Sequence, residues 1–136
     1  MTINAAERAA ALVGSRFRPQ GRDCATGLDC LGLVLAAHRI DPRHAPSDYR
    51  LRGEHRAALL AAAGRWFRRI AADKARVGDV LVMEPAPDQI HLAILTATGF
   101  VHADARLGRV VETPGSPAWP IAAVLRRRAR QKRNPR

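Results

Sequence analysis

A cysteine in the first third of the sequence follows a helix-capping pattern, and this position suits a nucleophile. The pattern Thr26-x-x-Asp29 places Cys30 in the first turn of an expected helix, next to backbone N–H groups that lack a partner within the helix. The partial positive charge at a helix start lowers the pKa of a thiol and favours the thiolate. We therefore expect Cys30 to be reactive, although a buried cysteine at the start of an apolar helix is more often structural.

Two histidines interrupt apolar runs in consecutive strand-like segments. His91 stands at the start of the first run and His102 lies within the next. A two-residue turn at residues 97–98 would pair His102 with Ala93, which makes the two histidines diagonal neighbours on one face, roughly 7 to 8 Å apart at Cα. One imidazole could then orient the other, whereas either histidine alone is most simply a core residue.

Together these three side chains fit the roles of nucleophile, base and orienting group in a papain-like triad. Cys30 would attack, His91 would take its proton, and His102 would orient His91. A zinc site that adds Cys24 to the three is an alternative, but the loop carrying Cys24 would have to close over the sheet. The C-x5-C spacing of the two cysteines is also not that of a zinc knuckle.

The elements that must hold these side chains change from helical to strand-like along the chain. Helical patterns cover residues 4–13, where Asn4-x-x-Glu7 is a capping pattern, residues 26–40 and residues 54–70. A loop rich in glycine, proline and charge covers residues 15–27. Strand-like runs follow at residues 79–83, 90–96, 100–103, 109–112 and 121–127. Helices first and then strands indicate an α+β fold, with N-terminal helices packed on an antiparallel β-sheet.

The positive charge of the chain is concentrated at its C-terminal end. The chain has 136 residues, the length of one domain, and a formal net charge of +11, to which residues 126–136 contribute seven Lys and Arg and no acid. Without that segment the net charge is 11 − 7 = +4. We assign residues 1–125 to one domain and residues 126–136 to a solvated basic tail, suited to docking on phosphates, teichoic acids or an acidic protein. No apolar run is long enough to span a bilayer, so membrane insertion is not expected.

Four stretches of the chain resemble motifs of the NlpC/P60 family of cysteine peptidases. The most specific is L-D-C-L-G-L-V at residues 28–34, which is similar to the nucleophile motif D-C-S-G-L-V of the family. The others are L-V-G-S-R-F-R at residues 12–18 with Gln20-Gly21 after it, V-G-D-V-L-V at residues 77–82, and the two histidine-bearing runs at residues 91–103. The resemblance covers about residues 6–125, nearly the whole domain.

The resemblance implies a papain-like fold and a peptidase that hydrolyses peptide bonds in the stem peptides of bacterial peptidoglycan. It implies Cys30 as nucleophile, His91 as general base and His102 as the third polar residue, without metal or organic cofactor. Two positions depart from the family pattern, because Phe17 stands where the family commonly has Tyr and Leu31 where it has Ser. Since phenylalanine cannot donate a hydrogen bond, backbone N–H groups near Cys30 would have to stabilise the oxyanion.

Two further residues are assigned to the substrate side of the site. Asp29, which the family motif keeps, would bind a substrate ammonium group or else simply cap the helix. Phe17 occupies the position of the family tyrosine and is therefore expected near the substrate.

The segment at residues 17–23 looks like the subgroup of this family found in the tails of phages and of phage-like gene transfer agents. The N-terminus also lacks the pattern of a secretory signal. We therefore expect synthesis in the cytoplasm and a final location in the tail of a virion or phage-like particle. The expected partners are peptidoglycan and the tail hub or baseplate proteins of that particle.

Other classes of protein stay open. A CHAP-type amidase has the same order of Cys before His but cuts a different wall bond. A tail-hub or adaptor protein that keeps the fold after catalysis has decayed is favoured by Phe17 and Leu31. Nucleic-acid binding through residues 126–136 would be nonspecific, since no aromatic residues are interleaved with the charges, and it is not expected.

Overall fold

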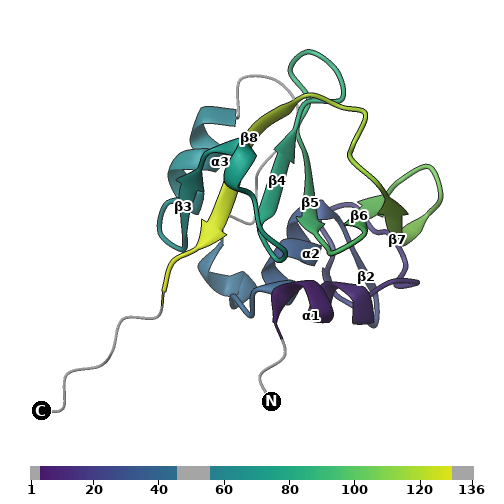
Figure 1. Ribbon diagram of the computed structural model, residues 1–136. Helices are drawn as coiled ribbons and strands as arrows, with labels where there is room; N and C mark the ends of the chain where they lie inside the picture. The colour runs from purple at the N-terminus through teal and green to yellow at the C-terminus, as the bar shows by residue number, and fades with distance from the viewer. Residues whose placement is uncertain (1–3, 46–55, 130–136) are drawn as a thin grey trace, which may run out of the picture.

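The computed structural model describes residues 4–45 and 56–129 of the chain (Figure 1). The helices are α1 (Ala5–Ala11), α2 (Cys30–Ala37) and α3 (Arg56–Ala63), with the short 3-10 helices η1 (Pro42–His44) and η2 (Ala72–Lys74). A small hairpin is formed by β1 (Arg22–Asp23) and β2 (Gly27–Leu28). The main sheet is formed by β3 (Phe67–Ile70), β4 (Val80–Met83), β5 (His91–Leu95), β6 (Gly99–Asp104), β7 (Arg109–Pro114) and β8 (Ile121–Arg127).

The six-stranded sheet has the strand order β3-β8-β4-β5-β6-β7, and each neighbouring pair is antiparallel. Figure 1 shows α1 and α2 together against the β5–β7 part of the sheet, while α3 lies toward the β3–β8 end. The predicted α+β class, with N-terminal helices on an antiparallel sheet, is confirmed. The predicted strands coincide with β4 to β8 to within a few residues, because each is a short apolar run bounded by turn residues.

Side chains on the two faces of the sheet form two separate apolar clusters. The cluster under the helices contains the buried α2 side chains together with Leu92, Ile94 and Val101. The cluster on the opposite face contains Ala93 and Phe100. Because strand side chains alternate, His91 and His102 belong to this second face. The helix that begins with Cys30 therefore packs on one face of the sheet, and the two histidines project from the other.

Capping side chains begin the first two helices. The Asn4 side chain accepts a hydrogen bond from the Glu7 N–H at 2.8 Å, as the capping pattern predicts. The second helix begins later than predicted, because its N-cap is Asp29 and not Thr26. Thr26 lies in the turn of the β1–β2 hairpin, within the segment predicted to be a loop. The prediction that Cys30 lies in the first helical turn is confirmed.

The predicted helix over residues 54–70 is wrong in its second half. The helix α3 ends at Ala63, and β3 follows at Phe67–Ile70, while residues 54 and 55 lie outside the described part of the chain. The strand forms because Phe67 pairs with Arg127 and Ile70 with Val124 of β8, which is distant in sequence. Local periodicity carries no information on such a pairing, so the run was assigned to the preceding helix.

The last strand continues past the predicted domain boundary at residue 125. Arg126 and Arg127 belong to β8, and the Arg126 guanidinium donates to both carboxylate oxygens of the buried Asp79, at 2.9 and 3.1 Å. The Arg128 side chain donates to the Gly64 carbonyl at 2.9 Å. These arginines are thus part of the folded unit, and residues 130–136 lie outside the described part of the chain.

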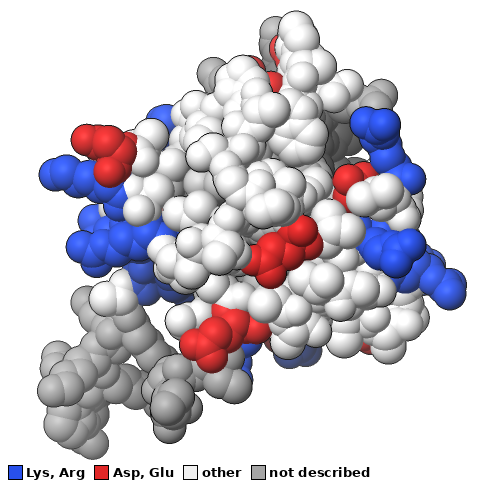
Figure 2. Space-filling model, turned by 45° about the vertical axis from the view of Figure 1, so that its right-hand side comes forward, with Lys and Arg blue, Asp and Glu red and all other residues white. Residues whose placement is uncertain are grey.

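Charged side chains are unevenly spread over the face drawn in Figure 2. The Lys and Arg side chains gather at its two sides, and the surface between them is mostly uncharged, with a few acidic groups. On this face the basic side chains of the described residues therefore form no continuous surface for a polyanion. No helix within the described ranges is long and apolar enough to cross a membrane.

Candidate active site

The predicted nucleophile lies at the junction of α2 and the loop before it. Cys30 is the first residue of α2 and is 3% exposed. Two residues later, Gly32 packs so closely on the loop that a Cβ there would lie 2.1 Å from the Gly21 carbonyl oxygen. Any larger residue at position 32 would push the helix start away from this loop, so glycine is required for the position of Cys30.

The Asp29 carboxylate joins this loop to the helix. Its Oδ1 accepts from the Gly32 N–H at 2.8 Å and from the Arg22 guanidinium at 2.8 Å. Its Oδ2 accepts from the Gln20 N–H at 3.0 Å, at a residue whose φ of 57° is unfavourable for a non-glycine side chain. The capping role that the sequence offered for Asp29 is confirmed. Its binding of a substrate ammonium group stays a prediction, and both oxygens already accept bonds from the protein.

The Cys30 sulfur lies beside β5 at the residue after His91. The sulfur is close enough to the backbone N–H groups of Leu92 and Leu31 for both to lower the thiol pKa, against the larger effect of burial. Strand β5 pairs with β6 through Ile94 with Val101 and Leu95 with Phe100. Backbone N–H groups of alternate residues in a strand point to the same side, so the Leu92 N–H points toward β6, as that of Ile94 does. Leu92 lies beyond the two paired positions. The thiol therefore occupies the open end between β5 and β6.

The two predicted histidines meet in a direct hydrogen bond. Nε2 of His91 lies 2.8 Å from Nδ1 of His102, and the rings are nearly perpendicular, at 88°. The predicted register is confirmed by the pairs of Ile94 with Val101 and Leu95 with Phe100, which are those that a two-residue turn at residues 97–98 requires. Within the described part of the chain this is the one side-chain hydrogen bond of His91, so its Nδ1 is left available to a proton donor.

Two residues that the sequence analysis missed complete the surroundings of this pair. Thr113 of β7 lies with its Oγ1 3.2 Å from Nε2 of His102. The Trp119 ring packs edge-on against both histidines, with ring centroids 5.4 Å from His91 and 5.9 Å from His102. A register for the β6–β7 hairpin would have placed Thr113 diagonally to His102. Trp119 lies in the connection between β7 and β8, where the sequence carries no comparable signal.

Burial controls the ionisation of the site. It raises the pKa of the Cys30 thiol to about 12, and the negative charge of Asp29 adds to the rise. The predicted lowering of this pKa by the helix start is therefore wrong, because desolvation of the thiolate outweighs the backbone hydrogen bonds. Burial lowers the pKa of His91 to about 4, with the neighbouring His102 as a second cause, and burial also lowers the pKa of His102. The resting site thus holds a neutral thiol and neutral imidazoles.

The remaining residues of interest lie around this centre. Phe17 bridges to Leu28, two residues before Cys30, and packs partly buried against the core under the helices. Its contact with substrate stays a prediction. Cys24 is exposed and Cys30 is buried. Among the residues that the structure describes, no three His, Cys, Asp or Glu side chains converge on a possible metal position, so the zinc alternative has no structural support.

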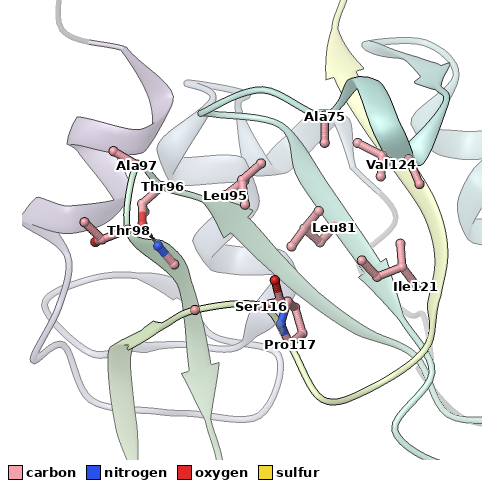
Figure 3. A pocket seen from close by; sticks show the side chains of 13 residues that line it. Ala75, Leu81, Leu95, Thr96, Ala97, Thr98, Ser116, Pro117, Ile121 and Val124 are labelled. Atoms are coloured by element: carbon pink, nitrogen blue, oxygen red, sulfur yellow. Dashed lines mark hydrogen bonds between the residues drawn. The ribbon is translucent and has the colours of Figure 1, made fainter.

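A pocket of ≈ 370 Å³ opens on the same face of the sheet as the histidines (Figure 3). Leu81, Leu95 and Val124 form its floor, and Ser116 and Pro117 form part of its rim. None of the five predicted site residues lines it, and none of its lining residues is ionisable. The lining has Ser and Thr hydroxyls but no ionisable side chain that could act as a base and activate them, so the candidate active site is the cluster around Cys30.

A helix that begins with a cysteine packs here on an antiparallel sheet whose strands carry a hydrogen-bonded histidine pair, and this α+β arrangement of helices and sheet matches the fold of a solved NlpC/P60 domain. The structure is similar to the NlpC/p60 domain of the peptidoglycan hydrolase SagA, with a TM-score of 0.57 and 20% identity over 82% of this chain and 90% of that one. It is also similar to the peptidoglycan hydrolase RipB from Mycobacterium tuberculosis, with a TM-score of 0.56 and 23% identity. That match covers 89% of this chain and 63% of RipB. No family model matches the sequence, and no curated protein matches it.

Proposed function

We propose that this protein is a cysteine peptidase that hydrolyses peptide bonds in the stem peptides of peptidoglycan. The observation that carries the proposal is the position of the Cys30 sulfur near the backbone N–H of Leu92, the residue after His91, while the His91 ring is hydrogen-bonded to His102. The two similar structures are described as peptidoglycan hydrolases, which supports the substrate class.

The geometry suggests how the proton would move. Since Nε2 of His91 is bonded to His102, Nδ1 is the atom that would take the proton from the Cys30 thiol. The sulfur then attacks the carbonyl carbon of the scissile bond, and backbone N–H groups at the start of α2 stabilise the oxyanion. His91 returns the proton to the leaving amine, and it then activates the water that hydrolyses the thioester.

Incubating the purified chain with peptidoglycan and identifying the released fragments by mass spectrometry tests the proposal. We expect cleavage between two amino acids of the stem peptide, and no cleavage by Cys30→Ser or His91→Ala. For the orienting residue, His102→Asn and His102→Gln should keep more activity than His102→Ala, with circular dichroism confirming that each variant is folded. Cleavage that persists in Cys30→Ser would overturn the assignment of the nucleophile.

A second function is favoured by one observation, the deep burial of the thiol. A cysteine that is 3% exposed with a pKa of about 12 also fits a structural protein that has kept the fold and lost catalysis. Such a tail-hub or adaptor protein would release no fragments from any peptidoglycan. A CHAP-type amidase would release fragments cut at a different wall bond, so the same product analysis separates the three functions.

The particle that carries the protein is a further part of the proposal. The similarity of residues 17–23 to enzymes of phage tails and gene transfer agents supports a place in such a tail, with hub or baseplate proteins as neighbours. Purifying particles from the source cells and probing them with an antibody against this chain tests this placement. A signal that follows the particles through density-gradient separation is expected, and a signal only in the particle-free fraction would contradict it.

A further inference from the structure

We propose that Thr113 is a positioning residue that ends a directed hydrogen-bond chain from Cys30 through both histidines. The inference rests on the proposed function, because the direction of the chain follows from His91 acting as the base. Its structural basis is the contact of 3.2 Å between Thr113 Oγ1 and Nε2 of His102, which continues the contact of 2.8 Å between the two rings.

Protonation of His91 fixes the direction of both hydrogen bonds. An imidazolium carries hydrogen on both nitrogens, so Nε2 of His91 must then donate, and Nδ1 of His102 must accept. A neutral His102 that accepts through Nδ1 carries its own hydrogen on Nε2. That N–H points at Thr113, whose hydroxyl oxygen is its acceptor. Thr113 thus accepts from His102 in the state in which His91 holds the proton of Cys30.

The surroundings of His102 make this acceptor necessary. His102 is 4% exposed, and its ring is packed against Phe100 and Trp119, so solvent cannot readily replace a lost partner. The ionisable groups that act on the histidine pair are the two rings themselves and Asp104, whose charge raises both pKa values against the larger effect of burial. A buried N–H without an acceptor destabilises the protein, and this free-energy penalty grows when its ring accepts a hydrogen bond from a positively charged imidazolium.

Thr113 also fits the role by its place in the fold. It lies in β7 opposite Phe100, two residues along from Val111, which pairs with His102. Thr113 and His102 are therefore diagonal neighbours on one face, as His91 and His102 are in the β5–β6 pair. Two successive diagonal contacts across three strands thus align the rings and the hydroxyl in one row.

The test compares Thr113→Val, which has the same shape without the hydroxyl, with Thr113→Ser, which keeps it. In cleavage of a soluble stem peptide, Thr113→Val should lower kcat by about tenfold or more with little change in KM, because a hydrogen bond to a charged network is lost. Thr113→Ser should restore most of kcat. The matched control is Thr98→Val, since the Thr98 hydroxyl bonds Glu112 at 3.2 Å and does not contact a histidine. Thermal melting of each variant separates this effect from misfolding.

A second measurement needs no substrate. Nitrogen chemical shifts of histidine-labelled protein at neutral pH report which ring nitrogen carries hydrogen, and we expect Nε2 for both His91 and His102. If the hydrogen of His102 lies on Nδ1, or if Thr113→Val keeps the kcat of the unchanged protein, the proposal is overturned. If these spectra are as expected but no peptidoglycan fragment is released by the unchanged protein, the proposed function fails while the hydrogen-bond chain stands.

Discussion

The buried His38 should make the fold sensitive to mild acid. His38 follows α2, is 7% exposed, and its Nε2 donates to the Gly78 carbonyl at 3.0 Å. Burial lowers the pKa of His38 to about 4, and the positive charges of Arg127 and Arg8 contribute in the same direction. The Gly78 hydrogen bond and Asp79 oppose this shift but do not overcome it.

The sign and size of the effect follow from the two protonation states. In the folded protein the ring stays neutral down to its pKa of about 4, whereas in the unfolded chain it is protonated below the ordinary histidine pKa of 6.5. The unfolded state therefore binds more protons between these values, and stability falls as the pH falls through this window. Between about pH 7 and pH 5, this single ring should lower the free energy of unfolding by ~2 kcal/mol.

The assay is denaturant unfolding at both pH values for the unchanged protein and for His38→Gln. Glutamine keeps an N–H that can donate to the Gly78 carbonyl but does not titrate, so the loss of stability on acidification should shrink by ~2 kcal/mol. His44→Gln is the control, because His44 ends the exposed η1 helix and is exposed itself. An unchanged loss in His38→Gln would show that the ring is not desolvated in the fold, and the reasoning would be refuted.

Three further predictions concern the site and the end of the sheet. Cys24→Ser should keep near-normal cleavage because Cys24 is exposed in the hairpin turn, and a loss as large as that of Cys30→Ser would contradict this. Asp29→Asn should lower the pKa of Cys30, because the negative charge of Asp29 is the second cause of the raised pKa. The pH dependence of thiol alkylation measures this pKa, and an unchanged profile would exclude the charge effect. Arg126→Ala should lower the melting temperature, because the buried Asp79 carboxylate loses its partner. Equal melting curves for Arg126→Ala and the unchanged protein would refute this.

The sequence was most informative where the relevant interactions are local. Each strand from β4 to β8 shows its own apolar run, and the two-residue turn at residues 97–98 set the register that joins His91 to His102. The family-like motif around Cys30 likewise located the helix start, since a cap needs only the few residues that follow it. These features could be predicted because neighbours along the chain determine them.

The features that could not be predicted depend on residues far apart in the sequence. Strand β3 forms by pairing with β8, so its residues were assigned to a helix. The inclusion of Arg126 in the fold depends on Asp79, and the basic composition of the C-terminal end concealed it. The raised pKa of Cys30 depends on its packing under β5, whereas the sequence shows only its place at a helix start. In each case tertiary burial or pairing overrides the local pattern.

A neutral resting site leads to a last prediction, on the reactivity of Cys30. With the thiol pKa at about 12 and the His91 pKa at about 4, the proton stays on sulfur at neutral pH, and no thiolate–imidazolium pair is stored. In the proposed reaction, proton transfer must then accompany attack on a bound substrate, whose carbonyl becomes the charged oxyanion.

Small alkylating reagents should therefore modify Cys30 slowly at neutral pH, with a rate that still rises in alkaline solution. The exposed Cys24 is the internal reference, and mass spectrometry of the digested protein gives the rate for each thiol. A stem-peptide analogue with an electrophilic carbonyl should label Cys30 at neutral pH, because it supplies the group that attack requires, and His91→Ala should abolish that labelling. Rapid alkylation of Cys30 with a plateau across neutral pH would mean that the thiolate exists before substrate binds, and that burial does not control this thiol.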